Sequence, residues 1–213
     1  RALVARASNQ EPVQYIVGQA QFLGRPFTVD PSVLIPRTAT ESVIQAVLDR
    51  QRGGVAGGAV PPIAWAADVG TGSGCLAVSL ALHLSDTDVV ATDLSPEAIE
   101  VARRNIDAHG LADRITLRQG DGIEPLRSEI TSGRFDLVVS NPPYIADATW
   151  LTLDANVREH EPVMALRGGA DGLDCIRRII TETADVLADD GLFVLEFGDD
   201  QASPVLALAE SLG

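Results

Sequence analysis

From residue 63 onward the sequence repeats one pattern, and this repeat constrains the fold more than any other feature. Short apolar segments alternate with glycine-containing turns and with segments whose apolar residues have helical spacing. The pattern predicts strands within residues 63–70, 88–94, 114–121, 135–141 and 191–198, and helices over 73–84, 95–108, 174–187 and 205–212. Continuously apolar strands separated by helices are typical of a parallel sheet covered on both faces. With right-handed crossovers, the expected fold is α/β, a doubly wound Rossmann-like sheet that is mostly parallel.

Shorter elements are expected before this repeat. Residues 1–12 are interpreted as the end of a helix that stops at Pro12 and, since no initiator Met precedes them, as the end of a helical domain outside this sequence. Residues 13–36 alternate apolar and polar around Gly24-Arg25-Pro26, which predicts a β-hairpin linker. The rest forms the main domain, residues 37–213, with a first helix over 40–52 and a flexible connector over 53–62.

Charge and composition narrow the class of partner. The 213 residues include sixteen basic residues, all arginine, and thirty acidic ones, giving a net charge of −14. Direct nucleic-acid binding is therefore not expected, because phosphates would be repelled at long range. The absence of lysine excludes Schiff-base and P-loop lysine chemistry. Three scattered His and two Cys predict neither a metal site nor a disulfide framework. No apolar run approaches the roughly 20 residues of a membrane span, so we expect a cytoplasmic protein without a membrane partner. We also expect a monomer.

A glycine-rich turn, Asp68 to Gly74, joins the first predicted strand to its helix and reads D-V-G-T-G-S-G. Its glycines permit a tight turn, and the following helix offers unpaired N–H groups to a carboxylate or phosphate. Asp93 ends the second strand, where a carboxylate can accept both hydroxyl protons of a ribose. The spacing G-x-G-x-G, with Cys75 next, differs from the G-x-G-x-x-G of nicotinamide enzymes and is usual in S-adenosylmethionine (AdoMet) methyltransferases. A structural turn with a helix-capping acid is the alternative.

A second motif, Asn141-Pro142-Pro143-Tyr144, follows the fourth predicted strand. In a doubly wound sheet the strand order reverses between the first and fourth strands, and ligands bind in the crevice there. We therefore expect this tetrapeptide to face the glycine turn. The Asn141 side-chain carbonyl and the Pro142 backbone carbonyl can accept both protons of a planar NH2 group, with Tyr144 over its face. Such a pocket suits methyl transfer to nitrogen. The alternative interpretation is a proline turn with a purely structural role.

Several segments together resemble one known family. They are PVQYIVGQAQFLGRPFTVDPSVLIPR, DVGTGSGCLAVSLA, ATDLSPEAIEVARRN, NPPYI, EPVMALRGGADGLD and VLEFG, and they extend from about Glu11 to the end. In these segments the chain resembles the PrmC/HemK family, the release factor glutamine N5-methyltransferases. N-P-P-Y alone also occurs in adenine-N6 DNA methyltransferases. The segment Ile35-Pro36-Arg37, with Glu161-Pro162 and residues 168–173, narrows the resemblance to this family.

The resemblance implies a reaction and a set of site residues. The methyl group of AdoMet is expected to pass to the glutamine of the Gly-Gly-Gln loop of peptide chain release factors, leaving S-adenosylhomocysteine, without a metal. The glutamine amide is expected on Asn141, Pro142, Pro143 and Tyr144, with Asn141, Pro142 and Tyr144 catalytic. The expected cofactor contacts are Gly70, Thr71, Gly72, Ser73, Gly74, Asp93, Leu94, Asp121, Gly122 and Asn141. The family's helical N-terminal domain and last strand pair are expected to lie outside this sequence.

The chain departs from the family pattern at two positions, and two other functions stay open. The family usually reads I-P-R-P-E-T-E where this chain has Thr38-Ala39-Thr40-Glu41 after Arg37, and it usually has a bulky aromatic residue at Gly122. One open alternative is an adenine-N6 nucleic-acid methyltransferase, which needs a basic and aromatic recognition segment that we do not find. The other is a non-catalytic AdoMet-binding module that docks a protein partner.

Overall fold

The computed structural model describes residues 2–53, 61–130 and 133–211. Its centre is a five-stranded parallel sheet with the strand order β5-β4-β3-β6-β7. The strands are β3 (Trp65–Val69), β4 (Asp88–Asp93), β5 (Ile115–Gln119), β6 (Phe135–Ser140) and β7 (Leu187–Leu195). The first of these strands, β3, lies between β4 and β6, so the winding reverses there. The predicted doubly wound α/β fold is confirmed.

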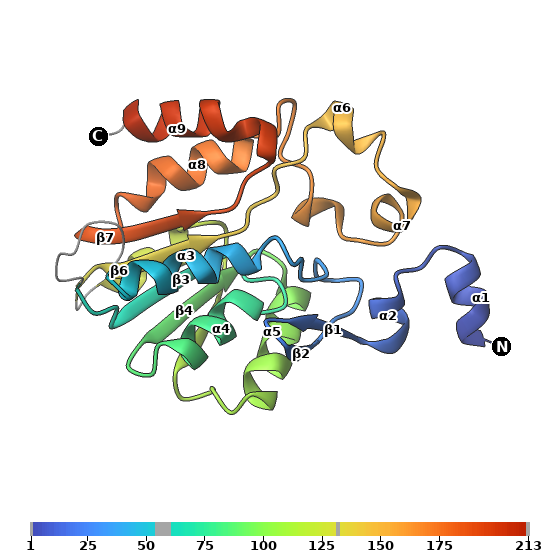
Figure 1. Cartoon of the computed structure of the whole chain (residues 1–213), viewed down its shortest axis with the longest axis horizontal. Coiled ribbons are helices and arrows are strands. Elements are labelled where there is room, and N and C mark those ends of the chain that lie inside the picture. Colours follow the sequence, from blue (N-terminus) through green and yellow to red (C-terminus); the bar gives the residue numbers. More distant parts are fainter. Residues whose placement is uncertain (1, 54–60, 131–132, 212–213) are drawn as a thin grey trace.

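Helices cover both faces of the sheet (Figure 1). Successive side chains of a strand point to opposite faces, so Ala66 and Ala67 of β3 are both buried, but in different cores. Helices α3, α4 and α5 pack in the core of Ala66, whereas η1 and α8 pack in the core of Ala67. Helix α9 packs on α8. The bounds are α3 (Glu41–Gln51), α4 (Cys75–His83), α5 (Pro96–Ala108), η1 (Glu124–Ser128), α8 (Asp174–Thr183) and α9 (Ala202–Ser211).

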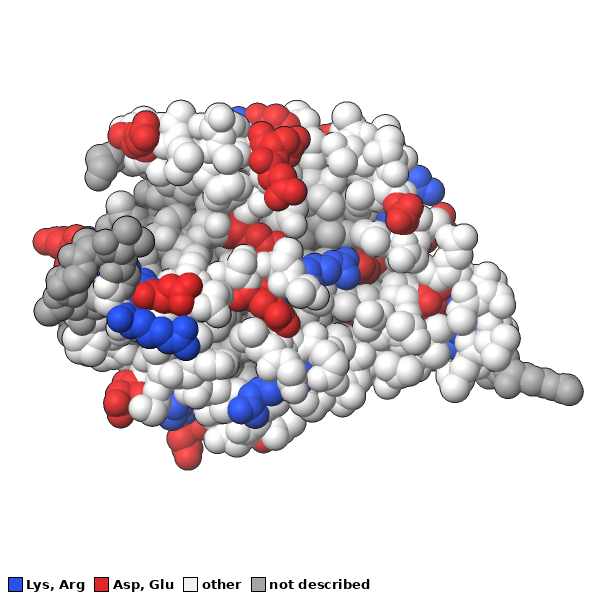
Figure 2. All heavy atoms as spheres, in the orientation of Figure 1, with Lys and Arg blue, Asp and Glu red and all other residues white. Residues whose placement is uncertain are grey.

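A loop region between β6 and α8 contains only short helices. These are α6 (Asp147–Trp150), α7 (Ala155–Arg158) and η3 (Val163–Ala165), while η4 (Asp199–Gln201) precedes α9. On the face drawn in Figure 2, arginine side chains lie scattered among acidic ones. Within the described ranges no helix is both long and apolar enough to span a bilayer.

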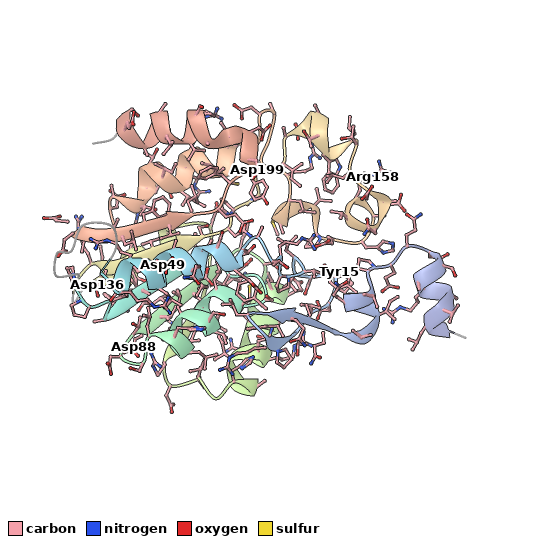
Figure 3. The ribbon with its side chains drawn as sticks, viewed as in Figure 1. Tyr15, Asp49, Asp88, Asp136, Arg158 and Asp199 are labelled. Carbon is pink, nitrogen blue, oxygen red and sulfur yellow. The ribbon has the colours of Figure 1, made fainter. Side chains whose placement is uncertain are left out.

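The N-terminal region contains the predicted hairpin, but in a shorter form. Strands β1 (Gln19–Phe22) and β2 (Arg25–Thr28) pair antiparallel, and the turn residues Leu23 and Gly24 both have positive φ. Residues 13–17 were expected in the first strand and instead form helix α2 (Val13–Val17), which ends at Gly18 with φ 73°. The physical reason is Tyr15 (labelled in Figure 3), which is buried and donates its hydroxyl to the Val33 carbonyl at 2.5 Å.

Other boundaries also shift. Helix α1 (Ala2–Ser8) ends four residues before Pro12. Helix α8 ends at Thr183 rather than 187, because Leu187 already pairs with Phe135 at the start of β7. The helix predicted over 205–212 begins at Ala202. The Ser95 cap of α5 is confirmed, since its hydroxyl accepts the Ala98 N–H at 3.1 Å. Of the predicted connector, residues 54–60 lie outside the described residues, and the division into three units stays a prediction.

The amino and carboxyl ends of the parallel strands have different surroundings. At the amino end, Asp136 (labelled in Figure 3) accepts the backbone N–H groups of Ala64 and Trp65 at 2.8 and 2.9 Å. These bonds satisfy the donors that lead into β3. At the carboxyl end, by contrast, the loops after β3, β4 and β6 surround a cavity.

Candidate active site

A cavity of about 200 Å³ lies at the carboxyl ends of β3, β4 and β6. Its walls include residues 70–73 of the glycine loop (residues 70–74) after β3, the end of β4 and the turn after β6. Residues 32–34, 36 and 37 and side chains of α8 also line it. The glycine loop and Asn141-Pro142-Pro143 therefore line one cavity, as the sequence predicted. It lies where the strand order reverses, the place at which open α/β sheets bind ligands.

The glycine loop is held by its backbone geometry. Gly70, Gly72 and Gly74 have φ values of 74°, 55° and 80°, which residues with a side chain rarely adopt. The N–H groups of Gly70 and Thr71 both donate to the Thr92 carbonyl, at 2.9 and 2.8 Å. A Cβ atom at Gly70 or Gly72 would meet no heavy atom within 4 Å. The loop thus presents bare backbone to the cavity.

Gly74 has a different role from its neighbours. A Cβ atom there would lie 3.3 Å from the Ala102 backbone of α5, and Gly74 is not part of the cavity wall. It stands as the N-cap of α4. Of the ten predicted cofactor contacts, the other nine line the cavity. Gly74 therefore allows α4 to pack closely against α5. The sequence alone could not distinguish this packing role from a role in ligand contact.

Asp68 is the fully buried acid beneath the loop. Its Oδ2 accepts the Thr71 hydroxyl at 2.6 Å and the Ala77 N–H at 3.0 Å, which ties the loop to the first turn of α4. Its Oδ1 has no hydrogen-bond partner among the described residues. Burial, the largest cause, raises the pKa of Asp68 to about 7.

Asp93 joins β4 to the glycine loop. Its Oδ2 accepts the Gly72 N–H at 2.8 Å, and its Oδ1 accepts the Ser95 N–H at 2.9 Å. Burial raises the pKa of Asp93, and the two backbone bonds oppose that rise. Each carboxylate oxygen has a further lone pair, so Asp93 can still accept hydroxyl protons from a ligand in the cavity.

Asn141 is oriented by a residue that sequence reasoning did not find. Its Nδ2 donates to the hydroxyl of Thr40 at 3.0 Å, and the Thr40 side chain is buried. With Nδ2 used as the donor in this bond, Oδ1 remains an acceptor. Among the described residues none donates to Oδ1 or to the Pro142 carbonyl. The adjacent Ser140 donates its hydroxyl to the Val69 carbonyl at 2.7 Å, which ties β6 to β3 below the turn.

Tyr144 does not lie in the cavity wall, which differs from the expectation that it covers a bound planar group. Its ring packs beside Leu173 and Ile176, and its hydroxyl donates to Glu196 Oε1 at 3.1 Å. Burial and the Glu196 carboxylate raise the pKa of Tyr144 to about 12. The physical reason for this placement is that a half-buried tyrosine packs its apolar ring and still needs a partner for its hydroxyl.

Two further contacts around the cavity join distant segments. Glu161 is buried, forms an ion pair with Arg37 and accepts the Ile35 N–H at 3.2 Å. On the opposite wall, Arg178 of α8 pairs with Asp121 at 2.7 Å. Helix α8 also contributes Cys175 and Ile179 to the wall. No local motif marks the α8 residues, since only the packing of that helix on the sheet brings them to the site.

The fold and cavity define a class, a Rossmann-like methyltransferase domain. A family model, the methyltransferase small domain, matches residues 62–157. A Pyrococcus furiosus methyltransferase structure is similar in fold, with a TM-score of 0.59 and 21% identity over 99% of this chain and 86% of that one. Release factor glutamine methyltransferases of Geobacter sulfurreducens and Moorella thermoacetica are 44% and 45% identical to this chain over its whole length, covering 70% and 71% of those proteins. The chain belongs to the release factor glutamine methyltransferase family.

The residues of the cavity fit the cofactor of such methyltransferases, S-adenosylmethionine. The bare backbone at Gly70 and Gly72 leaves room for close approach, and Asp93 supplies acceptors for ribose hydroxyls. Within the described ranges no group of His, Cys, Asp or Glu side chains could hold a metal ion.

Proposed function

We propose that this protein transfers a methyl group from AdoMet to the side-chain amide nitrogen (N5) of a glutamine, in the Gly-Gly-Gln loop of a peptide chain release factor. One observation supports this most directly: the Asn141 amide, oriented by Thr40, lines the same cavity as the glycine loop. The names of the curated relatives, which are 44% and 45% identical to this chain, agree with this acceptor. The products are the N5-methylated glutamine, S-adenosylhomocysteine and one proton, which the amide nitrogen loses as it takes the methyl group.

The acceptor amide is proposed to bind at Asn141 and Pro142. An amide nitrogen is a poor nucleophile because its lone pair is delocalised into the carbonyl group. The Asn141 Oδ1 and the Pro142 carbonyl are adjacent in the chain and accept no hydrogen bond from the described residues. A primary amide has two N–H protons to donate. Holding both protons orients the nitrogen toward the electrophile and stabilises the positive charge that develops on it.

The other wall is proposed to bind the cofactor. When bound, AdoMet supplies a methyl group on a positively charged sulfur, which is the electrophile. Asp93 and Leu94 would contact the ribose, the loop from Gly70 to Ser73 the amino-acid part, and the Asp121–Gly122 turn the base. Tyr144 would act from behind the turn, by fixing the backbone of Pro143 through its bond to Glu196.

The test is transfer of a labelled methyl group from AdoMet to a purified release factor. We expect incorporation into the factor, located by mass spectrometry on the loop glutamine and lost when that glutamine is replaced by alanine. Single-stranded and duplex oligonucleotides, each rich in adenine, serve as competing acceptors. Methylated adenine would instead support the nucleic-acid alternative. Binding of AdoMet without transfer to any release factor would support the non-catalytic docking module.

A further inference from the structure

Arg178 fills the space beside Gly122 at one end of the cavity. Gly122 has φ +58°, and a Cβ atom built on it would lie 3.3 Å from Arg178 Nη2 and 3.6 Å from Arg178 Cζ. The guanidinium group therefore lies in van der Waals contact with the glycine's position. Both residues line the cavity, together with Cys175 and Ile179 from the same helix as Arg178.

The edges of this guanidinium group are already bonded. Its Nη1 donates to Asp121 Oδ2 at 2.7 Å, its Nε donates to Glu182 Oε1 at 3.0 Å, and its Nη2 is 3.4 Å from the Asp121 carbonyl. All donors of a guanidinium group lie in its plane. These bonds therefore fix the orientation of the plane and occupy neither of its flat faces. Arginine stacks well on aromatic rings through such a face.

The position along the cavity indicates what would stack there. Under the proposed function, Asp93 contacts the ribose, and the Asp121–Gly122 turn follows β5, the strand next to β4. The base of the nucleoside would thus extend toward Arg178. Arg178 with its two carboxylate partners has a net charge of −1, so this group does not attract the carboxylate of the cofactor by charge.

We propose that Arg178 contributes to adenine binding by stacking the plane of its guanidinium group on the adenine ring. The guanidinium group occupies the space that the missing side chain of Gly122 leaves open. This inference rests on the proposed function. Arg37 also lines the cavity, but it pairs with Glu161 in the wall where Thr40 contacts Asn141. Among the described arginines of the cavity wall, Arg178 is therefore the one placed for this role. Arg178 is a binding residue and takes no part in the transfer itself.

The test measures binding of two probes by calorimetry, S-adenosylhomocysteine and 5′-methylthioadenosine, to the wild type and to Arg178→Lys and Arg178→Met. Both probes carry adenine, but only the first carries an amino-acid carboxylate. Lysine keeps the positive charge near Asp121 and loses the plane. We expect both variants to bind both probes about 2- to 5-fold more weakly, the range of an exposed cation–π contact. Arg177→Met is the matched control, because Arg177 pairs with Asp171 outside the cavity wall.

Each outcome separates the inference from the proposed function. An equal loss for the two probes, absent from the Arg177 control, supports stacking. If Arg178→Lys binds like the wild type, charge suffices and the stacking inference is wrong. A loss confined to S-adenosylhomocysteine would place Arg178 at the carboxylate and overturn it too. Wild-type protein that binds neither probe would overturn the proposed function itself.

Discussion

The two walls of the cavity are built over very different sequence distances. In the glycine-loop wall, Thr71 bonds Asp68 three positions away, and Gly72 bonds Asp93 21 positions away. In the wall around Asn141, the bond to Thr40 joins residues 101 positions apart, and that between Arg37 and Glu161 joins residues 124 apart. The first wall lies within one strand–helix–strand unit. The second is assembled from the segment before α3, the turn after β6 and the loop before α8.

This difference indicates where each kind of change should act. A wall formed within one unit has its shape fixed by local backbone angles, so substitutions there should alter local packing or charge. A wall assembled from distant segments depends on the few contacts that join them. Substitution of those contacts should therefore affect acceptor chemistry and global stability more strongly.

The largest effect is expected at Asn141. Asn141→Ala removes one proposed acceptor of the substrate amide and should lower the rate of methyl transfer by roughly 10²–10³, by analogy with the loss of one transition-state hydrogen-bonding partner. Single-turnover measurement of labelled methyl transfer gives this rate. Asn156→Ala, on the exposed surface of α7, is the matched control. A normal rate in Asn141→Ala would mean that Asn141 does not bind the acceptor amide.

Next in size is the loss of the Glu161 carboxylate. Glu161→Ala leaves the Ile35 N–H without its partner and removes the ion pair with Arg37, which should lower the free energy of unfolding by about 1–3 kcal/mol. The cost stays in this range because Arg37 keeps about a third of its side chain in water, at 34% exposure. Urea unfolding measures the change. Glu159→Ala, an exposed acid beside Arg158, should be near neutral, and equal values for the two variants would contradict the prediction.

A smaller effect is expected when the orientation of Asn141 is disturbed. Thr40→Val removes the hydroxyl that accepts from Nδ2 and should lower kcat about 3- to 10-fold, the value of one hydrogen bond. The KM for AdoMet should stay unchanged. Thr40→Ser keeps the hydroxyl and should restore most of the rate. Failure of serine to restore it would indicate a packing role for Thr40 rather than a positioning one.

The last effect is a pH dependence of stability, expected in the glycine-loop wall. Burial raises the pKa of Asp68 from 3.8 to about 7, so its contribution to stability is fully present below pH 4 and is lost as the pH rises through 7. Asp68→Asn cannot ionise, so its unfolding midpoint should rise relative to that of the wild type between pH 5 and 8. Thermal unfolding across that range measures the difference. Parallel curves for the two proteins would show that the Asp68 pKa is not raised.

The sequence predicted the elements whose signal is local. The glycine loop, the Ser95 cap and the apolar strands each have a short-range physical cause, namely backbone angles, a hydroxyl near free N–H groups, and burial on both faces. The assignment was ambiguous where the same residues fit both a helix and a strand. Residues 13–17 have the alternation of a strand, but burial of Tyr15 against Val33 favours a helical turn. Leu187 fits a helical repeat, yet it pairs with Phe135.

Sequence alone determined that the glycine loop and Asn141 would meet, because the reversal of strand order is a property of doubly wound sheets in general. Only the tertiary structure decided which side chains surround them. It turned Tyr144 toward Glu196, Asn141 toward Thr40 and Arg178 toward Asp121. These choices depend on packing between segments far apart in the chain, and a side chain's orientation follows from the shape and hydrogen-bonding groups of such neighbours, which no local pattern encodes.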